Sequence, residues 1–369
     1  MKKLAIIGAS YLQLPIVKKA NEMDIETHCF AWEKGAVCKD FSRFYYPLSI
    51  LDKDHILEVC REKKIDGVIS LASDAAVPTI SYVAEKMGLI ANAYDDMLVA
   101  TNKYKMRQEF FANGVPSPRY MLDDENMDDK NLHYPLIVKP VDRSGSLGVL
   151  KIDKQNDLAD AVKRAKKESF TQGAIIEEYV SGIEVSVEAI SWEGVHYILA
   201  ITDKVTTEAP YFVEVAHHQP CQLSNSIQEK IKAETLKALC SLHIKYGASH
   251  SEFKINDRGE IFIIEVGARM GGDFIGSHLV QLSTGYDFLK GVIDIALGHF
   301  DIPVLDKKNF SGVYFLCEET KHVLPYIKNA GDYHEIVEAA ITDEKIRPVQ
   351  SSADRSGYFI YQRYCKFQV

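Results

Sequence analysis

The sequence lacks the features that mark several large classes of protein. Its seven cysteines are dispersed and form no C-x-x-C pair, which argues against a disulfide framework or zinc site and fits a reduced, cytoplasmic protein. No stretch is long and apolar enough to span a membrane. No long basic run accompanies the net charge of −9, so nucleic acid and anionic membranes are not expected as partners. The apolar run Leu4–Ile7 is too short for a signal peptide and predicts a buried first strand.

Two catalytic signatures are also missing. The turn after the first strand reads Gly8-Ala9-Ser10 and lacks the G-x-G-x-x-G spacing, which disfavours an NAD-dependent dehydrogenase without removing it as a rival. The sequence shows no Ser/His/Asp or Cys/His motif in a recognisable context, so no protein nucleophile is expected.

The chain is long and apolar enough to form more than one core. Its 369 residues and 46% hydrophobic content predict two or three domains. The first ~95 residues alternate strand and helix, which predicts a parallel α/β sheet. Further along we expect an acidic loop over Asp123–Lys130, a strand over Tyr211–Ala216, and a helix begun by a capping box from Ser226 to Glu229.

An apolar strand that ends on Lys139 leads into a loop rich in serine and glycine, made up of Ser144, Gly145, Ser146 and Gly148. Glycine lets backbone N–H groups approach an anion, serine adds hydroxyl donors, and lysine adds a point charge. The segment therefore suits a polyphosphate. Alone, it is equally compatible with an ordinary hairpin turn that carries a surface lysine.

Two glutamates flank a predicted hairpin. Glu252 precedes and Glu265 follows the tip Asn256–Gly259, so the two carboxylates are expected close together on paired strands. Like charges need a cation between them, and Mg²⁺ uses few protein carboxylates because phosphate oxygens and water complete its octahedron. The alternative is two exposed glutamates on opposite faces.

A second anion-binding element follows this hairpin directly. Arg269 would lie beside the metal carboxylates, where a guanidinium suits a phosphoryl group or a substrate carboxylate. Gly271 and Gly272 could offer backbone N–H groups to the same anion. The alternative is an arginine paired with Glu265 for structure alone.

An acidic strand end lies between the loop and the hairpin. The residues Glu177, Glu178, Tyr179 and Val180, followed by Glu184, have the composition of a nucleotide rim. Backbone groups there would meet the adenine edge, and a carboxylate would accept hydrogen bonds from ribose hydroxyls.

Taken in order, these elements resemble the ATP-grasp superfamily. The order runs through Asn102-Lys103, Val138-Lys139-Pro140 with Ser144–Gly148, Glu177–Val180 with Glu184, Glu252, and Glu265-Val266-Gly267-Ala268-Arg269. The resemblance implies ATP as cosubstrate and Mg²⁺, with Mn²⁺ as an alternative. It implies that Lys103 and Lys139 hold ATP phosphates, that the serine–glycine loop closes over them, and that Arg269 stabilises the phosphoryl group. Glu177–Val180 would border the adenine, Glu184 the ribose, and the two hairpin glutamates the metal.

The resemblance also implies the architecture. We expect a Rossmann-like parallel α/β domain over residues 1–97, then a two-lobed ATP-grasp fold. Its central, lid-bearing subdomain spans 98–182, and its antiparallel subdomain with the metal site spans 183–300. A small capping lobe would take residues 301–369.

One position departs from the family pattern. Many members carry an asparagine two residues after the second metal glutamate as a further ligand, and here that residue is Gly267. Either another ligand, such as water, takes its place or one Mg²⁺ site is weaker.

Within the superfamily, the segments around Glu265–Asp273 and Phe212–Pro220 are most similar to carboxylate–amine ligases of the L-amino-acid ligase type. This implies an acyl-phosphate mechanism on small-molecule carboxylate and amine substrates, with His217, Asp273 and the two glycines near them. For His217 the alternative is a surface histidine at a strand end. A purine-pathway or carboxylating enzyme and a non-catalytic ATP sensor remain rivals, and a homodimer, common in related proteins, remains open.

Overall fold

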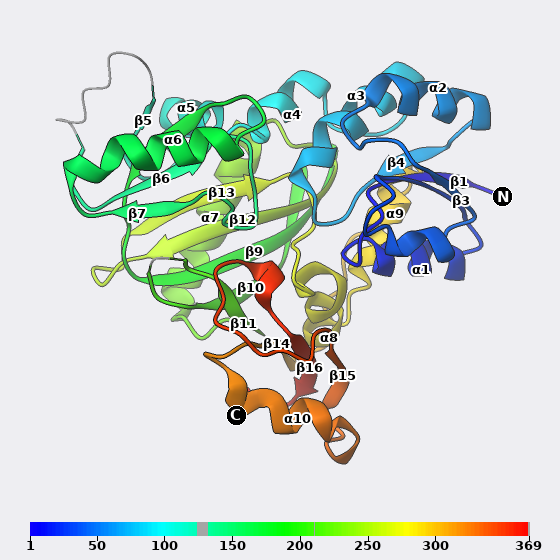
Figure 1. Cartoon of the computed structure of the whole chain (residues 1–369). Helices are drawn as coiled ribbons and strands as arrows, with labels where there is room; N and C mark the ends of the chain where they lie inside the picture. Colours follow the sequence, from blue (N-terminus) through cyan, green and yellow to red (C-terminus); the bar gives the residue numbers. More distant parts are fainter. Residues whose placement is uncertain (124–131, 210, 368–369) are drawn as a thin grey trace.

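The computed structural model describes residues 1–123, 132–209 and 211–367 of the chain. From residue 124 onward, the expected acidic loop over Asp123–Lys130 lies outside the described residues. The strands form three sheets, which Figure 1 shows side by side with the N-terminal sheet separated from the other two. This mixed α/β architecture confirms the expected fold class.

The N-terminal sheet is parallel, as the alternation of strand and helix predicts. Its order is β3-β2-β1-β4, with β1 (Lys3–Ile7), β2 (Glu26–Phe30), β3 (Phe44–Tyr46) and β4 (Gly67–Ile69). The helices of this region are α1 (Leu14–Glu22), α2 (Lys53–Lys63), α3 (Val77–Met87) and α4 (Tyr94–Ala100). Functional residues of such sheets lie where the strands end at their carboxyl edge.

The second sheet is antiparallel and carries the serine–glycine loop. Its order is β5-β8-β6-β7, with β5 (Tyr120–Leu122), β6 (Leu136–Pro140), β7 (Leu150–Ile152) and β8 (Ala174–Glu178). The helices here are α5 (Lys103–Ala112) and α6 (Leu158–Glu168). Helix α6 covers one face of this sheet, where Leu158 and Val162 pack on Leu136 and Val138. The serine–glycine loop between β6 and β7 therefore begins at a strand that is held by a packed core.

The third sheet has eight strands and joins the middle of the chain to its C-terminal part. Its order is β13-β12-β9-β10-β11-β14-β16-β15, with β9 (Ile183–Trp192), β10 (Val195–Thr206), β11 (Glu214–Gln219), β12 (Gly247–Ile255), β13 (Ile261–Gly267), β14 (Phe310–Leu316), β15 (Ile336–Ile341) and β16 (Gly357–Arg363). Because β14 pairs with β11, the strands after residue 300 extend this sheet (Figure 1). The region 301–369 is therefore continuous in hydrogen bonding with the subdomain before it.

The remaining helices connect and cover these strands. The α-helices are α7 (Asn225–Ser241), α8 (Val280–Thr284), α9 (Phe288–Ala296) and α10 (Leu324–Lys328). Single turns of other helix types are η1 (Val37–Asp40), η2 (Asp74–Ala76), η4 (Gln155–Asp157), η5 (Ile275–Leu279), η6 (Lys321–Val323), η7 (Ala330–Asp332) and η8 (Ser352–Asp354). Helix α9 packs between α1 and β12, so its apolar face joins the N-terminal domain to the large sheet.

Two local predictions are wrong. The capping box at Ser226 does not form, because α7 already begins after Ser224, whose hydroxyl contacts the Ser226 hydroxyl at 3.2 Å. Glu229 pairs with Lys232 instead. The strand expected over Tyr211–Ala216 begins only at Glu214, since Phe212 adopts a left-handed backbone with φ of 49° that a strand cannot contain.

Candidate functional site

A cleft of about 970 Å³, here called the nucleotide cleft after the nucleotide-binding residues that the sequence predicts for it, lies between the small antiparallel sheet and the end of the large one. Among the residues that line it are all but one of those predicted to hold nucleotide or metal: Lys103, Lys139, Ser144, Gly145, Ser146, Glu177, Glu178, Tyr179, Val180, Glu184, Glu252, Glu265 and Arg269. The exception, Gly148, is needed for the turn itself. Its φ is +75°, and an added Cβ would lie 3.0 Å from the Pro140 side chain.

Both predicted phosphate lysines are buried in the cleft wall and paired with glutamates. Lys103 is placed by the start of α5, where the Asn102 side chain accepts hydrogen bonds from two backbone N–H groups at 3.1 Å each. Its Nζ lies 2.7 Å from Glu265 Oε1. Lys139 Nζ lies 2.7 Å from Glu177 Oε2 across the β6–β8 pair. Each lysine therefore has a fixed position before any ligand binds.

Glu177 acts as a buried counter-ion, although the family resemblance suggested an adenine contact for it. Its carboxylate is 2.8 Å from the Nε of Arg107, a fully buried arginine on α5 that sequence reasoning missed. Burial alone would raise the pKa of Glu177, but Arg107 and Lys139 outweigh it and hold the pKa below its usual value. The same burial lowers the pKa of Lys139, against the attraction of Glu177. Glu177 thus keeps Lys139 in place.

The hairpin brings the two predicted metal ligands face to face. Glu252 on β12 is the register partner of Glu265 on β13. The Glu252 carboxylate is 2.7 Å from Lys204, a buried lysine of β10 that also contacts Glu184 at 2.9 Å and Glu214 at 3.4 Å. Burial lowers the pKa of Lys204, but the three carboxylates dominate and keep it well above its usual value. Sequence reasoning missed Lys204. The one feature that could have pointed to it is a lysine within a predicted strand in which about half of the residues are apolar.

These carboxylates fit Mg²⁺ better than a metal held by protein alone. No group of three or more histidine, cysteine, aspartate or glutamate side chains suited to a metal occurs within residues 1–123, 132–209 and 211–367. Mg²⁺ is usually held by one or two carboxylates together with substrate phosphates. Burial raises the pKa of Glu252, yet Lys204 and His250 outweigh burial and lower it well below the usual range. Glu252 is therefore ionised and able to serve as a ligand.

His250 is a further charged group that the sequence did not single out. Its Nδ1 contacts the Glu188 carboxylate, and its Nε2 lies 3.2 Å from Glu252. Burial lowers its pKa, but the two glutamates raise it to about 9. His250 is register partner to Glu188 on β9, so strand pairing creates this contact.

Arg269 lies beside the carboxylate pair, but its partner is Asp74 of the N-terminal domain. Its Nε and Nη2 donate to the two oxygens of Asp74 at 2.9 and 2.8 Å. The alternative pairing with Glu265 is therefore wrong. Arg269 lines both the nucleotide cleft and the cavity next to it.

The neighbouring cavity, here called the substrate pocket, has a volume of about 720 Å³. It shares Ser144, Gly145, Glu214, Glu252 and Arg269 with the nucleotide cleft. Its other walls come from three distant parts of the chain: Tyr11, Leu12 and Ala72; then Lys204, His217, His250, Gly272, Asp273 and Ile275; then Ser352 and Arg355. The two cavities thus meet at Glu252, a predicted metal ligand, and at Arg269.

The residues predicted to bind substrate lie in two different cavities of the structure. His217, Gly272 and Asp273 line the substrate pocket. Gly271 lines a smaller neighbouring hollow with Tyr11, and its backbone N–H already donates to Glu188 at 2.9 Å. That N–H is therefore not available to an anion, which corrects the predicted role of Gly271.

His217 and Asp273 form a polar wall that the C-terminal region completes. His217 is 1% exposed, so the alternative of a surface histidine is wrong. Its Nε2 lies 3.7 Å from Asp273 Oδ2, and its Nδ1 has no hydrogen-bond partner within the described residues. Asp273 accepts two hydrogen bonds of 2.7 Å from Arg355, whose guanidinium lies over the Phe315 ring. Sequence reasoning missed Arg355, because its partner is 82 residues away.

The remaining expectations concern cysteines and membranes. All seven cysteines are free, and five are buried. None of the helices that the structure describes is long and apolar enough to cross a membrane.

Comparison with known proteins agrees with this geometry. The family model for the ATP-grasp domain matches residues 132–277, which hold the loop, the nucleotide rim and the paired glutamates. This chain carries an ATP-grasp domain. The matched segment ends inside η5, shortly after Asp273.

Two ligases and a purine-pathway enzyme illustrate the similarity. The chain is 26% identical over 302 residues to an alanine–anticapsin ligase of Bacillus subtilis, covering 74% of this chain and 63% of the relative. The fold matches an L-amino acid ligase from Bacillus licheniformis with a TM-score of 0.81, at 24% identity and with 99% and 94% of the two chains covered. It also matches phosphoribosylglycinamide synthetase from Anaerococcus prevotii with a TM-score of 0.77, at 21% identity and 99% and 94% coverage.

The match in sequence is partial. The chain spans 60–63% of the length of the first curated relatives it matches. The ATP-grasp domain and the fold are therefore established by comparison, whereas activity and substrates are a matter for proposal.

Proposed function

We propose that this protein is an ATP- and Mg²⁺-dependent carboxylate–amine ligase that forms an amide bond through an acyl phosphate, with an amino acid among its substrates. The observation that carries the proposal is the junction of two cavities at Glu252 and Arg269. One cavity has buried lysines and a serine–glycine loop, which suit a nucleotide. The other is lined by charges of both signs, which suit a small polar substrate.

In this proposal the nucleotide lies in the larger cleft with its phosphates toward Lys103 and Lys139. The backbone and hydroxyl groups of Ser144–Ser146 add donors, and their loop is the natural lid. Tyr179 and Val180 border the base, and Glu184 lies near the ribose. Glu252 and Glu265 would hold Mg²⁺, or Mn²⁺ in its place, which neutralises phosphate charge when bound.

The chemistry then requires positioning more than it requires a protein nucleophile. A substrate carboxylate oxygen attacks the γ-phosphorus, the bond to ADP breaks, and an acyl phosphate forms. The amine nitrogen next attacks the acyl carbon, the carbon–oxygen bond to phosphate breaks, and the amine loses a proton. Arg269, between the two cavities, is placed to neutralise the phosphoryl charge in the first step.

The substrate pocket supports an amino acid on grounds of charge. Lys204 and Arg355 on its walls are cationic, and Glu214 and Asp273 are anionic. A zwitterion can be complemented by both signs at once. His217 adds a ring nitrogen without a partner in the described part of the chain.

The experiment is a phosphate-release screen of purified protein with ATP, Mg²⁺ and pairs of amino acids, followed by mass spectrometry of the products. We expect release only when both an acid and an amine are present. The Glu252→Gln variant, prepared in parallel, reports any contaminating ATPase.

The rivals give different outcomes in this screen and in binding assays with ATP and NAD. Turnover that needs bicarbonate but no amino acid would indicate a carboxylating or purine-pathway enzyme. ATP binding without release across the whole panel would indicate a sensor. NAD binding would indicate a dehydrogenase of the N-terminal sheet.

Three further expectations belong to this proposal. The division at residues 97, 182 and 300 assigns the lid to the second region and the metal site to the third. The free cysteines fit a reducing, cytoplasmic location. A homodimer is the assembly to test by light scattering.

A further inference from the structure

The pair formed by Asp74 and Arg269 joins residues 195 positions apart. Asp74 begins η2, just after β4 at the carboxyl edge of the N-terminal sheet, and Arg269 follows β13 of the large sheet. Both oxygens of the aspartate are used, by Nε and by Nη2. The N-terminal domain therefore reaches the arginine that lies between the two cavities.

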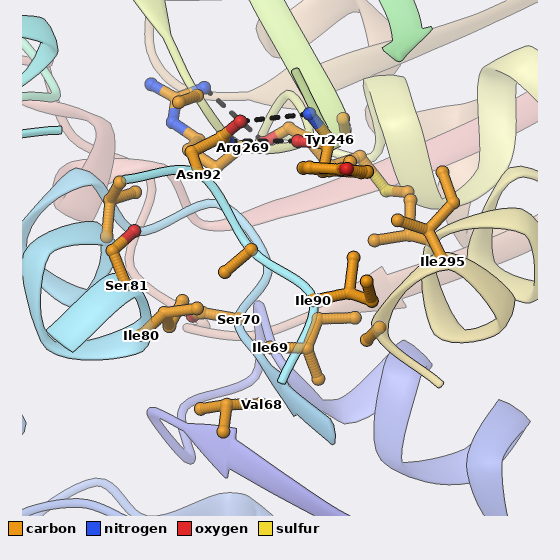
Figure 2. A pocket seen from close by; sticks show the side chains of 18 residues that line it. Val68, Ile69, Ser70, Ile80, Ser81, Ile90, Asn92, Tyr246, Arg269 and Ile295 are labelled. Atoms are coloured by element: carbon orange, nitrogen blue, oxygen red, sulfur yellow. Dashed lines mark hydrogen bonds between the residues drawn. The ribbon is translucent and has the colours of Figure 1, made fainter. Parts of the chain in front are cut away.

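Three cavities border the side chain of this arginine. Arg269 borders the nucleotide cleft, the substrate pocket and a third, mainly apolar cavity of about 550 Å³. Figure 2 shows this third cavity, with Arg269 at one end near Asn92 and Tyr246, and with Ile69 and Ile295 on its walls. A side chain with open space on several sides needs polar contacts to hold one orientation.

The hydrogen bonds supply that orientation and leave one edge of the guanidinium available. Besides the two bonds to Asp74, Nη1 donates to the Met270 carbonyl at 3.4 Å. A guanidinium has five N–H groups, so two remain without a protein partner in the described part of the chain. Burial raises the pKa of Asp74, but Arg269 dominates and holds it below its usual value, so the pair stays charged.

Gly267 lies directly against the Asp74–Arg269 pair. A Cβ added there would lie 2.7 Å from Asp74 Oδ1 and 2.9 Å from both Cζ and Nε of Arg269. These distances are below any ordinary contact, and the backbone φ of Gly267 is not in the left-handed region. A side chain at position 267 would therefore have to displace the Asp74 and Arg269 side chains from their present pairing, whereas the backbone conformation does not call for glycine. The departure from the family's asparagine is explained by the aspartate that takes the same volume from another domain.

We propose that Asp74 is a positioning residue that fixes the free edge of Arg269 toward the transferring phosphoryl group, and that Gly267 is present to admit it. The inference rests on the proposed function, because it assumes that a nucleotide phosphate faces Arg269. It adds that the N-terminal domain takes part in phosphoryl transfer without touching the nucleotide.

The test measures binding of Mg·ADP by calorimetry, with and without aluminium fluoride as a mimic of the transferring phosphoryl group. We expect the wild type to bind ADP more tightly when the fluoride is present. Asp74→Asn should keep its affinity for ADP alone, which also reports folding, and should lose about 10–100-fold of the fluoride-dependent gain. In Gly267→Ala the added methyl group would collide with the Asp74 and Arg269 side chains. This variant should also keep its affinity for ADP alone and lose the fluoride-dependent gain.

Two controls separate positioning from a general loss of stability. Asp66→Asn removes a carboxylate just before β4 that accepts hydrogen bonds from the exposed Lys2 side chain and the Lys3 backbone N–H, and it should keep the full gain. In an Arg269→Lys background, Asp74→Asn should cause no further loss, because a residue that acts through another shows no independent effect.

The outcomes distinguish this inference from the proposed function. An unchanged gain in Asp74→Asn, or losses that multiply in the double variant, would overturn the inference alone. A wild type that does not bind ADP would overturn the proposed function and the inference with it.

Discussion

The nucleotide cleft and the substrate pocket are adjacent, yet they are built in different ways. The cleft takes its charged side chains from neighbouring strands and the start of α5. Lys139 contacts Glu177 diagonally across the β6–β8 pair, and Glu252 is the register partner of Glu265. The substrate pocket takes walls from residue 11 to residue 355. Under the proposed function, the difference teaches that phosphate binding is encoded within one domain, whereas substrate choice depends on how the two ends of the chain reach the substrate pocket.

The N-terminal domain and the C-terminal region each contribute one half of an arginine–aspartate pair at the pocket. Asp74 of the N-terminal domain holds Arg269, and Arg355 of the C-terminal region holds Asp273, each through two hydrogen bonds of 2.7–2.9 Å. Paired charges of this geometry are specific in direction as well as strong. The first pair fixes an arginine at the proposed phosphate site, and the second fixes an aspartate at the proposed substrate site.

The largest effect is expected when the pair of glutamates in the nucleotide cleft is broken. Glu265→Gln removes a metal ligand and the partner of Lys103, so phosphate release should fall by about 100-fold or more. Glu260→Gln changes an exposed glutamate on the same hairpin and should retain wild-type release. Release by Glu265→Gln within twofold of the wild type would remove the metal assignment.

Lys139→Ala should damage the cleft without altering the substrate pocket. Losing one charge-assisted contact should raise the KM for ATP by about 10–100-fold, while the KM for the amino acid changes little. Steady-state kinetics with each substrate varied in turn measures both values, and Lys154→Ala, an exposed lysine, is the control. Equal increases in both KM values would contradict the assignment of ATP and the amino acid to separate cavities.

Arg355→Ala should produce the opposite pattern. In this variant Asp273 loses its hydrogen-bond partner, and the substrate pocket loses its C-terminal wall. The KM for the amino acid should therefore rise by roughly 10-fold, while the KM for ATP stays unchanged. Arg363→Ala removes a half-exposed arginine from the nearby strand β16 and should have no such effect. A rise confined to ATP would contradict the account.

The smallest effect on activity is expected at His218, the neighbour of His217 on β11. His218 contacts Tyr361, and burial lowers its pKa from 6.5 to about 3. The unfolded chain therefore binds a proton below about pH 6.5 that the folded chain refuses, so stability falls with decreasing pH until about pH 3. At pH 5 this amounts to roughly 2 kcal/mol.

His218→Gln should remove that dependence while leaving phosphate release at pH 7.5 unchanged. Urea unfolding of both proteins at pH 5 and pH 7.5 measures the difference between the two stability changes. Equal changes in both proteins would show that His218 is not the group responsible.

The sequence predicted the cleft more fully than the pocket, for a physical reason. Strand patterning and a short hairpin tip suffice to bring Glu252 opposite Glu265, and a strand followed by a glycine loop suffices to place Lys139. Arg107, Asp74 and Arg355 act through partners 70 to 195 residues away. No local period or turn signal encodes such contacts, so only the folded chain reveals them.

Oxygen transfer from the substrate acid tests the central claim most directly. An amino acid labelled with ¹⁸O in its carboxylate is incubated with ATP, Mg²⁺ and an amine, and the released phosphate is analysed by mass spectrometry. The account predicts that each phosphate carries one ¹⁸O atom, because the carboxylate oxygen that attacks phosphorus stays with it when the amide forms. Unlabelled phosphate released alongside an amide product would contradict an acyl-phosphate intermediate.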